Sequence, residues 1–299
     1  GYAFYADGGC YDLTLSGNHF FKNQSSDKGV TAAIKISDDG ANASNGTAPT
    51  SFCRNIRIVN NTSYGNPLNH VNAQGITDDL VISANHFVTT DDSFAELTDA
   101  ATIATKESVV AQYYTTTSDV DSGRHERTIV IANNVLRNAR WAALYFNDNL
   151  TTLEASNFGG AVASITGNVI ENFGLDVESG ETTYKQNGIS ILTARTVAVT
   201  GNTIANSGTS GNGIPCAGIQ VHGNGQQGAD VLTATVTGNA IQNCEIGIRF
   251  GENVGQIVCN SNSVTTATTS CLKISTIDAV SENTGYTGRA VIDGNSFVV

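Results

Sequence analysis

Three acidic residues stand at spacings that would let carboxylates act together. Glu96 and Asp99 follow Asn85 by 11 and 14 residues, and Asp148 follows Asn134 by 14. If the two asparagines hold equivalent places in stacked turns of chain, Asp99 and Asp148 lie on neighbouring strands about 4.8 Å apart. Glycoside hydrolysis needs such a pair, one group to protonate the departing oxygen and one to attack the sugar or activate water. We predict these three residues as catalytic, with Asp148 or Glu96 as acid and Asp99 as base. A solvent-facing acidic edge and a cation site are the alternatives.

Aromatic and polar residues near the carboxylates point to a sugar-binding surface. Trp141 is the single tryptophan, and it precedes Tyr145 and Asp148 in the same turn of chain. An aromatic ring offers a sugar an apolar face with a polar edge, although Trp141 equally suits a corner of the core. The residues predicted to bind substrate are Asn72, Tyr113, His125, Arg140, Trp141 and Tyr145.

A repeated motif predicts the elements that position these side chains. In its clearest form, Ile165-Thr-Gly-Asn168-Val-Ile170, an apolar residue, a spacer and a small residue precede an asparagine. The motif asparagines are Asn18, Asn61, Asn85, Asn134, Asn168, Asn202, Asn239, Asn262 and Asn295. The shortest intervals between them are 23 and 24 residues, too short for a helical crossover plus strands. Each repeat is therefore read as one coil of a solenoid, with the asparagine amides stacked in a ladder.

A second repeated strand follows each asparagine by about nine residues. It reads Gly188-Ile-Ser-Ile191, Gly218-Ile-Gln-Val221 and Gly247-Ile-Arg-Phe250, so apolar residues alternate with outward-facing polar ones. With these two motifs the whole chain resembles the right-handed parallel β-helix superfamily, the pectate-lyase-like proteins. The predicted fold is all-β, a right-handed single-stranded parallel β-helix with three short strands in each of about nine coils.

The repeat spans nearly all of the 299 residues, which favours a single domain over 1–299. Loop insertions are expected near 37–54, 98–127 and 174–187, and long loops on a rigid scaffold often carry binding sites. The chain has no methionine and its first residues lack the features of a signal peptide. We interpret it as a fragment of a longer protein.

Composition restricts the partners. Acidic residues outnumber basic ones by 27 to 15, a net charge of −12, which disfavours nucleic acid and anionic membranes. No apolar run predicts a transmembrane segment, and no residue spacing predicts a metal site or a cofactor. Cys216, Cys244 and Cys271 precede repeated strands and are interpreted as buried small side chains, with a disulfide or metal site as the alternative.

The resemblance also suggests a function. Similar β-helices occur in polysaccharide lyases, epimerases, rhamnogalacturonases and bacteriophage tailspikes. Likeness to a tailspike implies a homotrimer, located outside the cell or on the virion tail, that binds and cleaves a bacterial surface polysaccharide as an endo-glycosidase. A noncatalytic adhesive or structural fibre rod, and a secreted polysaccharide lyase or C5-epimerase, are the alternatives.

Overall fold

The protein is described by a computed structural model covering most of the chain. The described residues are 2–6, 10–21, 32–37, 53–66, 69–76, 79–89, 108–115, 126–150, 160–175, 186–209, 215–223, 231–251, 254–274 and 289–298. They form β-strands joined by turns, with no helix that could span a membrane among them.

The strands form three parallel sheets of nine strands each. Sheet I contains β1 (Phe4–Ala6), β4 (Ala32–Ile36), β7 (Asn69–Ile76), β10 (Val109–Thr115), β13 (Leu144–Leu150), β16 (Ile189–Ile191), β19 (Ala217–Val221), β22 (Ile246–Phe250) and β25 (Ser270–Ile274). Sheet II contains β2 (Thr14–Ser16), β5 (Ile56–Val59), β8 (Leu80–Ser83), β11 (Glu126–Ala132), β14 (Gly160–Thr166), β17 (Thr196–Thr200), β20 (Val231–Thr237), β23 (Val254–Asn260) and β26 (Arg289–Asp293). Sheet III contains β3 (His19–Phe21), β6 (Thr62–Tyr64), β9 (His86–Val88), β12 (Val135–Arg137), β15 (Val169–Phe173), β18 (Thr203–Ser207), β21 (Ala240–Gln242), β24 (Ser263–Thr265) and β27 (Ser296–Val298).

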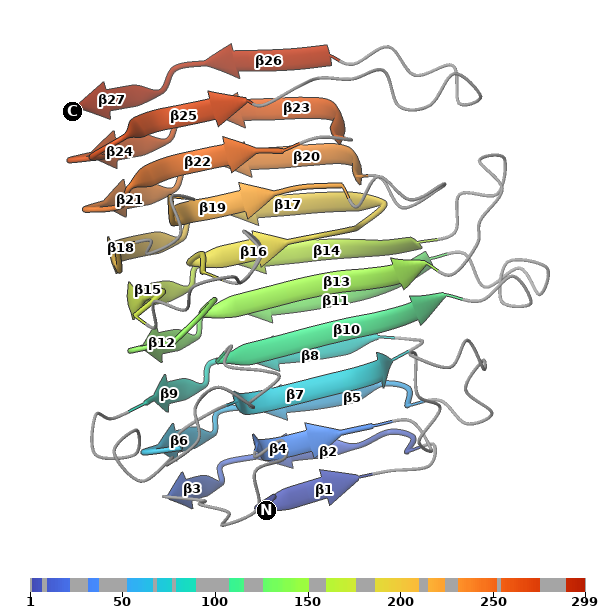
Figure 1. Ribbon diagram of the computed structural model, residues 1–299. Helices are drawn as coiled ribbons and strands as arrows, with labels where there is room; N and C mark the ends of the chain where they lie inside the picture. Colours follow the sequence, from blue (N-terminus) through green and yellow to red (C-terminus); the bar gives the residue numbers. More distant parts are fainter. Residues whose placement is uncertain are drawn as a thin grey trace.

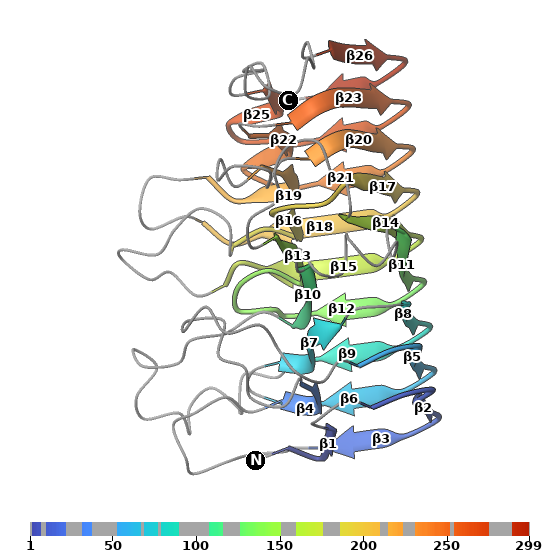
Figure 2. The ribbon, with the colours of Figure 1, turned by 90° about the vertical axis from the view of Figure 1, so that its right-hand side faces the viewer.

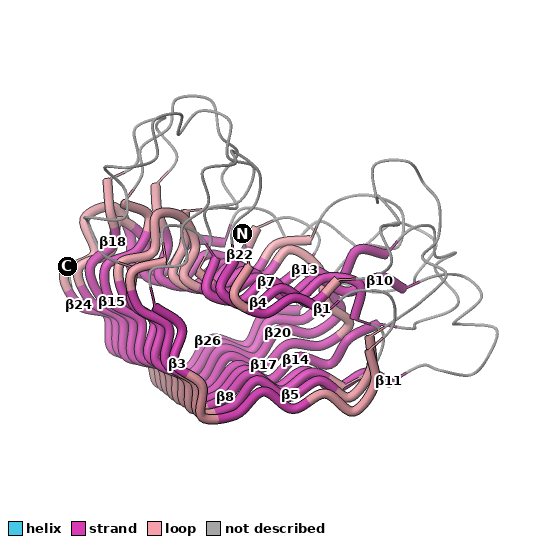
Figure 3. Tube along the Cα trace, turned by 90° about the horizontal axis from the view of Figure 1, so that it is seen from below, coloured by secondary structure: helices cyan, strands magenta, loops and turns pink. Residues whose placement is uncertain are grey.

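Each coil contributes one strand to each sheet, and each strand pairs with its equivalents one coil before and after. Figure 1 shows the coils stacked from the N-terminal to the C-terminal end, and Figure 2 shows the same stack from the side. Viewed along the stack in Figure 3, successive coils superpose around one interior. The arrangement is a right-handed parallel β-helix with three strands per coil, as predicted.

Aliphatic side chains fill the interior in columns that run along the axis. Ile34, Val71, Leu144, Ile189 and Ile219 belong to one such column in sheet I, and each is fully buried. Burying a side chain of this size stabilises the fold by about 1.5–3 kcal/mol. Cys216, Cys244 and Cys271 are also buried, in agreement with their interpretation as small core residues.

The nine motif asparagines form an unbroken ladder, which we call the inner ladder. From Asn18 to Asn262, each side-chain amide donates to the side-chain oxygen of the asparagine one coil further on, at 2.9–3.1 Å. From Asn61 onward the amide also bonds a strand carbonyl of the preceding coil, as Asn168 does with the oxygen of Ile131 at 2.9 Å. Stacking of equivalent amides is the reason that asparagine recurs at this position.

The residue before each inner-ladder asparagine adopts the left-handed backbone conformation. Its φ lies between 53° and 69° in all nine coils. Glycine reaches this region without strain, whereas a side chain with Cβ makes it costly. The motif therefore prefers glycine before asparagine, and Ala84 is an exception with a φ of 56°.

A second ladder, which we call the outer ladder, was not predicted. It lies four residues after the inner one and consists of Asn138, Asn172, Asn206, Asn243 and Thr266. Its side chains bond one another from coil to coil at 2.5–3.2 Å, and every member has a positive φ. The recurrence of asparagine at this second spacing was the available signal.

Candidate functional site on the outer face of sheet I

Alternate residues of sheet I point away from the core and form a column along the rod. This outer column consists of Tyr5, Lys35, Asn72, Val110, Tyr145, Ser190, Gln220, Arg249 and Lys273. The residues on either side of each member in its strand belong to the core or pack against it, so the column lies on the opposite face. Repeat spacing predicted most of these neighbours.

One coil departs from the prediction. The column position expected for Glu96 is held by Val110, which pairs with Asn72 on one side and Tyr145 on the other. The strand of this coil, β10, begins at Val109, inside the stretch expected to be an insertion at 98–127. Counting a constant distance from Asn85 failed because the additional residues precede the strand instead of following it.

The predicted pairing of Asp99 with Asp148 is wrong for the same reason. Asp148 lies within β13, three residues after Tyr145, and its partner in β10 is Tyr113. Glu96, Asp99 and His125 lie outside the residues that the structure describes, and a catalytic role for the three carboxylates stays a prediction.

Asn72 lies in the column as predicted, and it is buried and hydrogen-bonded. Its side-chain oxygen accepts from Nζ of Lys35 at 3.2 Å, and its Nδ2 donates to the side-chain oxygen of Asn69 at 3.4 Å. Lys35 itself is only 7% exposed. The Lys35 ammonium and the Asn72 amide in this part of the column therefore already have hydrogen-bond partners within the protein.

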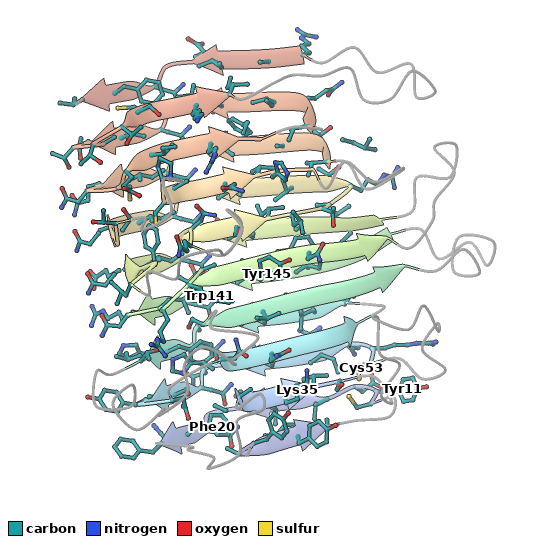
Figure 4. The ribbon with its side chains drawn as sticks, viewed as in Figure 1. Tyr11, Phe20, Lys35, Cys53, Trp141 and Tyr145 are labelled. Carbon is teal, nitrogen blue, oxygen red and sulfur yellow. The ribbon has the colours of Figure 1, made fainter. Side chains whose placement is uncertain are left out.

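Trp141 does not offer an open aromatic face. It is 1% exposed, whereas Tyr145 is half-buried. Figure 4 shows where Trp141, before β13, and Tyr145, on that strand, lie. Arg140 is also half-buried. Of the predicted sugar-binding residues whose side chains are described, Tyr145 is the one on the outer column with partial exposure.

The C-terminal end of the outer column carries two cations on adjacent strands. Arg249 of β22 pairs in register with Lys273 of β25 and with Gln220 of β19. Nη1 of Arg249 donates to Oε1 of Gln220 at 3.3 Å, and the same oxygen accepts from Nδ2 of Asn187 at 3.2 Å. We call Gln220, Arg249 and Lys273 the cationic end.

Two neighbouring groups modify the charge of the cationic end. Burial, and then the nearby Arg249 guanidinium, lower the pKa of His222 to about 4, so this imidazole is neutral at physiological pH. The carboxylate of Glu245 accepts the backbone N–H of Cys216 at 2.6 Å. Arg249 and Lys273 therefore supply the positive charge on this face.

The described residues include no group of three or more His, Cys, Asp or Glu side chains that could hold a metal ion. Arg249 is one of the outward-facing polar residues of the repeated strand predicted from the sequence, but it was not among the residues predicted to bind substrate. The sign of the charge along the column was the signal that would have found the cationic end.

The architecture defines the protein as a right-handed parallel β-helix with a polar face along one of its three sheets. Comparisons with protein families, curated proteins and solved structures find no match to this chain.

Proposed function

We propose that this protein is a polysaccharide-binding β-helix whose glycan lies along the outer face of sheet I and carries negative charge. The observation that carries the proposal is the charge of the outer column. Arg249 and Lys273 are members, the third cation, Lys35, is buried and bonded to Asn72, and none of the nine members is acidic, although the whole chain has a net charge of −12. A cationic strip on an acidic rod favours an anionic ligand over a neutral one.

One other member of the column suits a sugar ligand. Tyr145 is half-buried and presents a phenol, whereas Ser190 and Gln220 on the next two strands are buried. A phenol hydrogen-bonds to sugar hydroxyls, and a guanidinium binds a carboxylate through two parallel N–H groups. Strands about 4.8 Å apart give a long linear array, which matches an extended polymer better than a compact metabolite.

Binding is tested with matched charge changes on two faces. Arg249→Ala removes a cation from the proposed site, and Arg57→Ala removes one from an exposed position in β5 of sheet II. We expect Arg249→Ala to weaken binding of an acidic polysaccharide such as polygalacturonate about tenfold or more, since a charge-assisted bond contributes about 1.5–3 kcal/mol.

Affinity electrophoresis in gels containing polygalacturonate or dextran measures the effect. Arg57→Ala is expected to bind as wild type does, and dextran, which is neutral, is expected to bind weakly or not at all. Equal losses in the two variants, or equal retention by the two polymers, would contradict an anionic glycan on sheet I.

We extend the proposal to cleavage of the bound polymer, with Glu96, Asp99 and Asp148 as the candidate acids. The support is that Asp148 belongs to β13, the strand that also carries Tyr145. In this extension the protein is an endo-glycosidase of a bacterial surface polysaccharide, acting as a tailspike-like homotrimer outside the cell or on a virion.

Sizing the polymer after incubation with capsular or O-antigen polysaccharides separates an enzyme from a noncatalytic rod. Ultraviolet absorbance of unsaturated uronates separates a lyase from a hydrolase. Asp99→Asn and Asp148→Asn are expected to abolish cleavage while binding persists. Full activity in both variants would remove these residues from the mechanism.

A further inference from the structure

Two cysteines of the first two coils lie side by side at one corner of the rod. Tyr11 and Arg54 form a parallel bridge, and Cys10 and Cys53 are the residues immediately before them. The sulfur atoms of Cys10 and Cys53 are 3.0 Å apart. The backbone holds this register, since the N–H of Arg54 donates to the carbonyl of Cys10 at 2.9 Å. Cys53 and Tyr11 are labelled in Figure 4.

The two thiols differ in accessibility. Cys10 is half-buried, whereas Cys53 is fully buried. Residues that pair in register on neighbouring strands also have the short Cα separation that a disulfide requires. One accessible thiol in contact with one protected thiol is the arrangement that allows an attacking and a resolving cysteine.

We propose that Cys10 and Cys53 form a disulfide that fastens the first coil to the second when a small-molecule disulfide such as oxidised glutathione is present. The Cys10 thiolate attacks one sulfur of oxidised glutathione, a protein–glutathione bond forms, and one glutathione thiolate leaves. The Cys53 thiolate then attacks the Cys10 sulfur, the protein disulfide forms, and the second glutathione thiolate leaves. Two electrons pass from the protein thiols to glutathione, and their two protons end on the two released thiols.

The position of the pair gives the bond a mechanical consequence. In the coil that holds Cys10, β1, β2 and β3 pair with β4, β5 and β6 of the coil that holds Cys53. Tyr5 and Phe21 of this coil are 51% and 65% exposed. A covalent link here ties the coil of β1, β2 and β3 to the coil of β4, β5 and β6.

The other four cysteines provide an internal control. Burial raises the pKa of Cys216 and Cys244 to about 12 and that of Cys259 to about 11, and it also raises the pKa of Cys271. Thiolates are the reactive species. These thiols are therefore expected to stay reduced under conditions that oxidise the pair at the corner.

The test is to treat the folded protein with oxidised glutathione, quench in acid, alkylate remaining thiols in denaturant and map the peptides by mass spectrometry. We expect the Cys10 peptide linked to the Cys53 peptide, with the other four cysteines alkylated. Recovery of both cysteines as alkylated or glutathione-capped residues, or links between chains, would overturn the proposal.

Cys10→Ser is the variant of choice because its side chain is half-buried and the substitution is close in size. The oxidised wild type is expected to melt at a higher temperature than the reduced wild type, while Cys10→Ser melts at the same temperature in both buffers. If oxidation raises the melting temperature of Cys10→Ser as much as that of wild type, the Cys10–Cys53 disulfide is not the cause of the stabilisation.

Discussion

The inner ladder consists of asparagines and the outer ladder of asparagines ending in Thr266, both repeated once per coil, yet the two ladders differ in environment. Asn168 of the inner ladder is fully buried, and its amide and oxygen bond to Asn202, Asn134 and the backbone of Ile131. Asn206 of the outer ladder is exposed and bonds to its neighbours beside water.

This difference implies that the contribution of a polar ladder to the free energy of unfolding depends on how deeply the ladder is buried. A buried amide that loses its partner pays the full cost of desolvation, whereas an exposed one exchanges its partner for water. The inner ladder is therefore expected to hold the coils in register, and the outer ladder to shape the corner. Five experiments break or sharpen this comparison.

The largest effect is expected from Asn168→Ala. The change removes the acceptor for the N–H and the amide of Asn134 and the donor to the carbonyl of Ile131. At about 1–3 kcal/mol for each buried group left unsatisfied, the loss of unfolding free energy should reach about 3–5 kcal/mol. Urea unfolding followed by circular dichroism measures it.

The matched change in the outer ladder is Asn172→Gly. Glycine keeps the positive φ of 57° at this position, so the variant loses only the bonds to Asn138 and Asn206. Its cost should stay below about 1 kcal/mol. Similar costs in the two ladders would mean that burial does not separate them.

A buried histidine extends the comparison to pH. The nitrogens of His70 lie 2.7 and 3.1 Å from the hydroxyl oxygens of Ser63 and Thr89, and the ring stacks on Phe87. Burial lowers the pKa of His70 to about 3. Because the unfolded chain takes up this proton near pH 6.5 and the folded chain near pH 3, the stability His70 contributes is present above pH 6.5 and is lost as pH falls toward 3.

Unfolding of wild type and His70→Gln at several pH values tests this point. The difference in unfolding free energy between them should change by up to about 1.4 kcal/mol per pH unit in that window. His86→Gln, at an exposed position of β9, is the control and should leave the wild-type pH profile unchanged. If the unfolding free energy of His70→Gln followed the same pH dependence as that of wild type, burial of His70 would not be the cause of the pH dependence.

A smaller effect is expected before the inner ladder, at Ala84. Its φ of 56° is costly for a residue with Cβ, so Ala84→Gly should stabilise the protein by about 0.5–1 kcal/mol. Gly201 is the reverse case, because its φ is 63° and a Cβ added there meets nothing within 4 Å. Gly201→Ala should therefore cost about 1 kcal/mol from strain alone. Thermal unfolding of both variants shows whether each change raises or lowers the melting temperature. A change in the same direction for both would contradict the cost assigned to Cβ at positive φ.

The smallest effect is expected from an ion pair on the exposed face of sheet III. Nε of Arg137 and Oε2 of Glu171 are 2.8 Å apart, with side chains 44% and 39% exposed. Water and salt screen such pairs, so Glu171→Gln should cost less than about 1 kcal/mol at low salt and nothing measurable at 1 M salt. An unfolding cost that stays the same at 1 M salt would contradict the view that this ion pair is exposed and screened by solvent.

The architecture was predictable from spacing because each coil repeats the same physical problem. An apolar residue must face the interior, a left-handed residue must turn the corner, and an asparagine must bond the next coil. The predictions failed where a coil departs from the repeat, as at Val110, which holds the position assigned to Glu96. A loop of unknown length before a strand shifts every residue counted from the preceding asparagine, and nothing local in the sequence marks where the strand resumes.

The stack of coils, the inner ladder and most of the outer column could be predicted from the sequence alone, because short-range periodicity specifies them. The tertiary structure alone decided that Trp141 is buried, that Cys10 meets Cys53, and that Val110 holds the column position between Asn72 and Tyr145. These features join residues of different coils across loops of unequal length, and the register between coils becomes known only once the chain is wound.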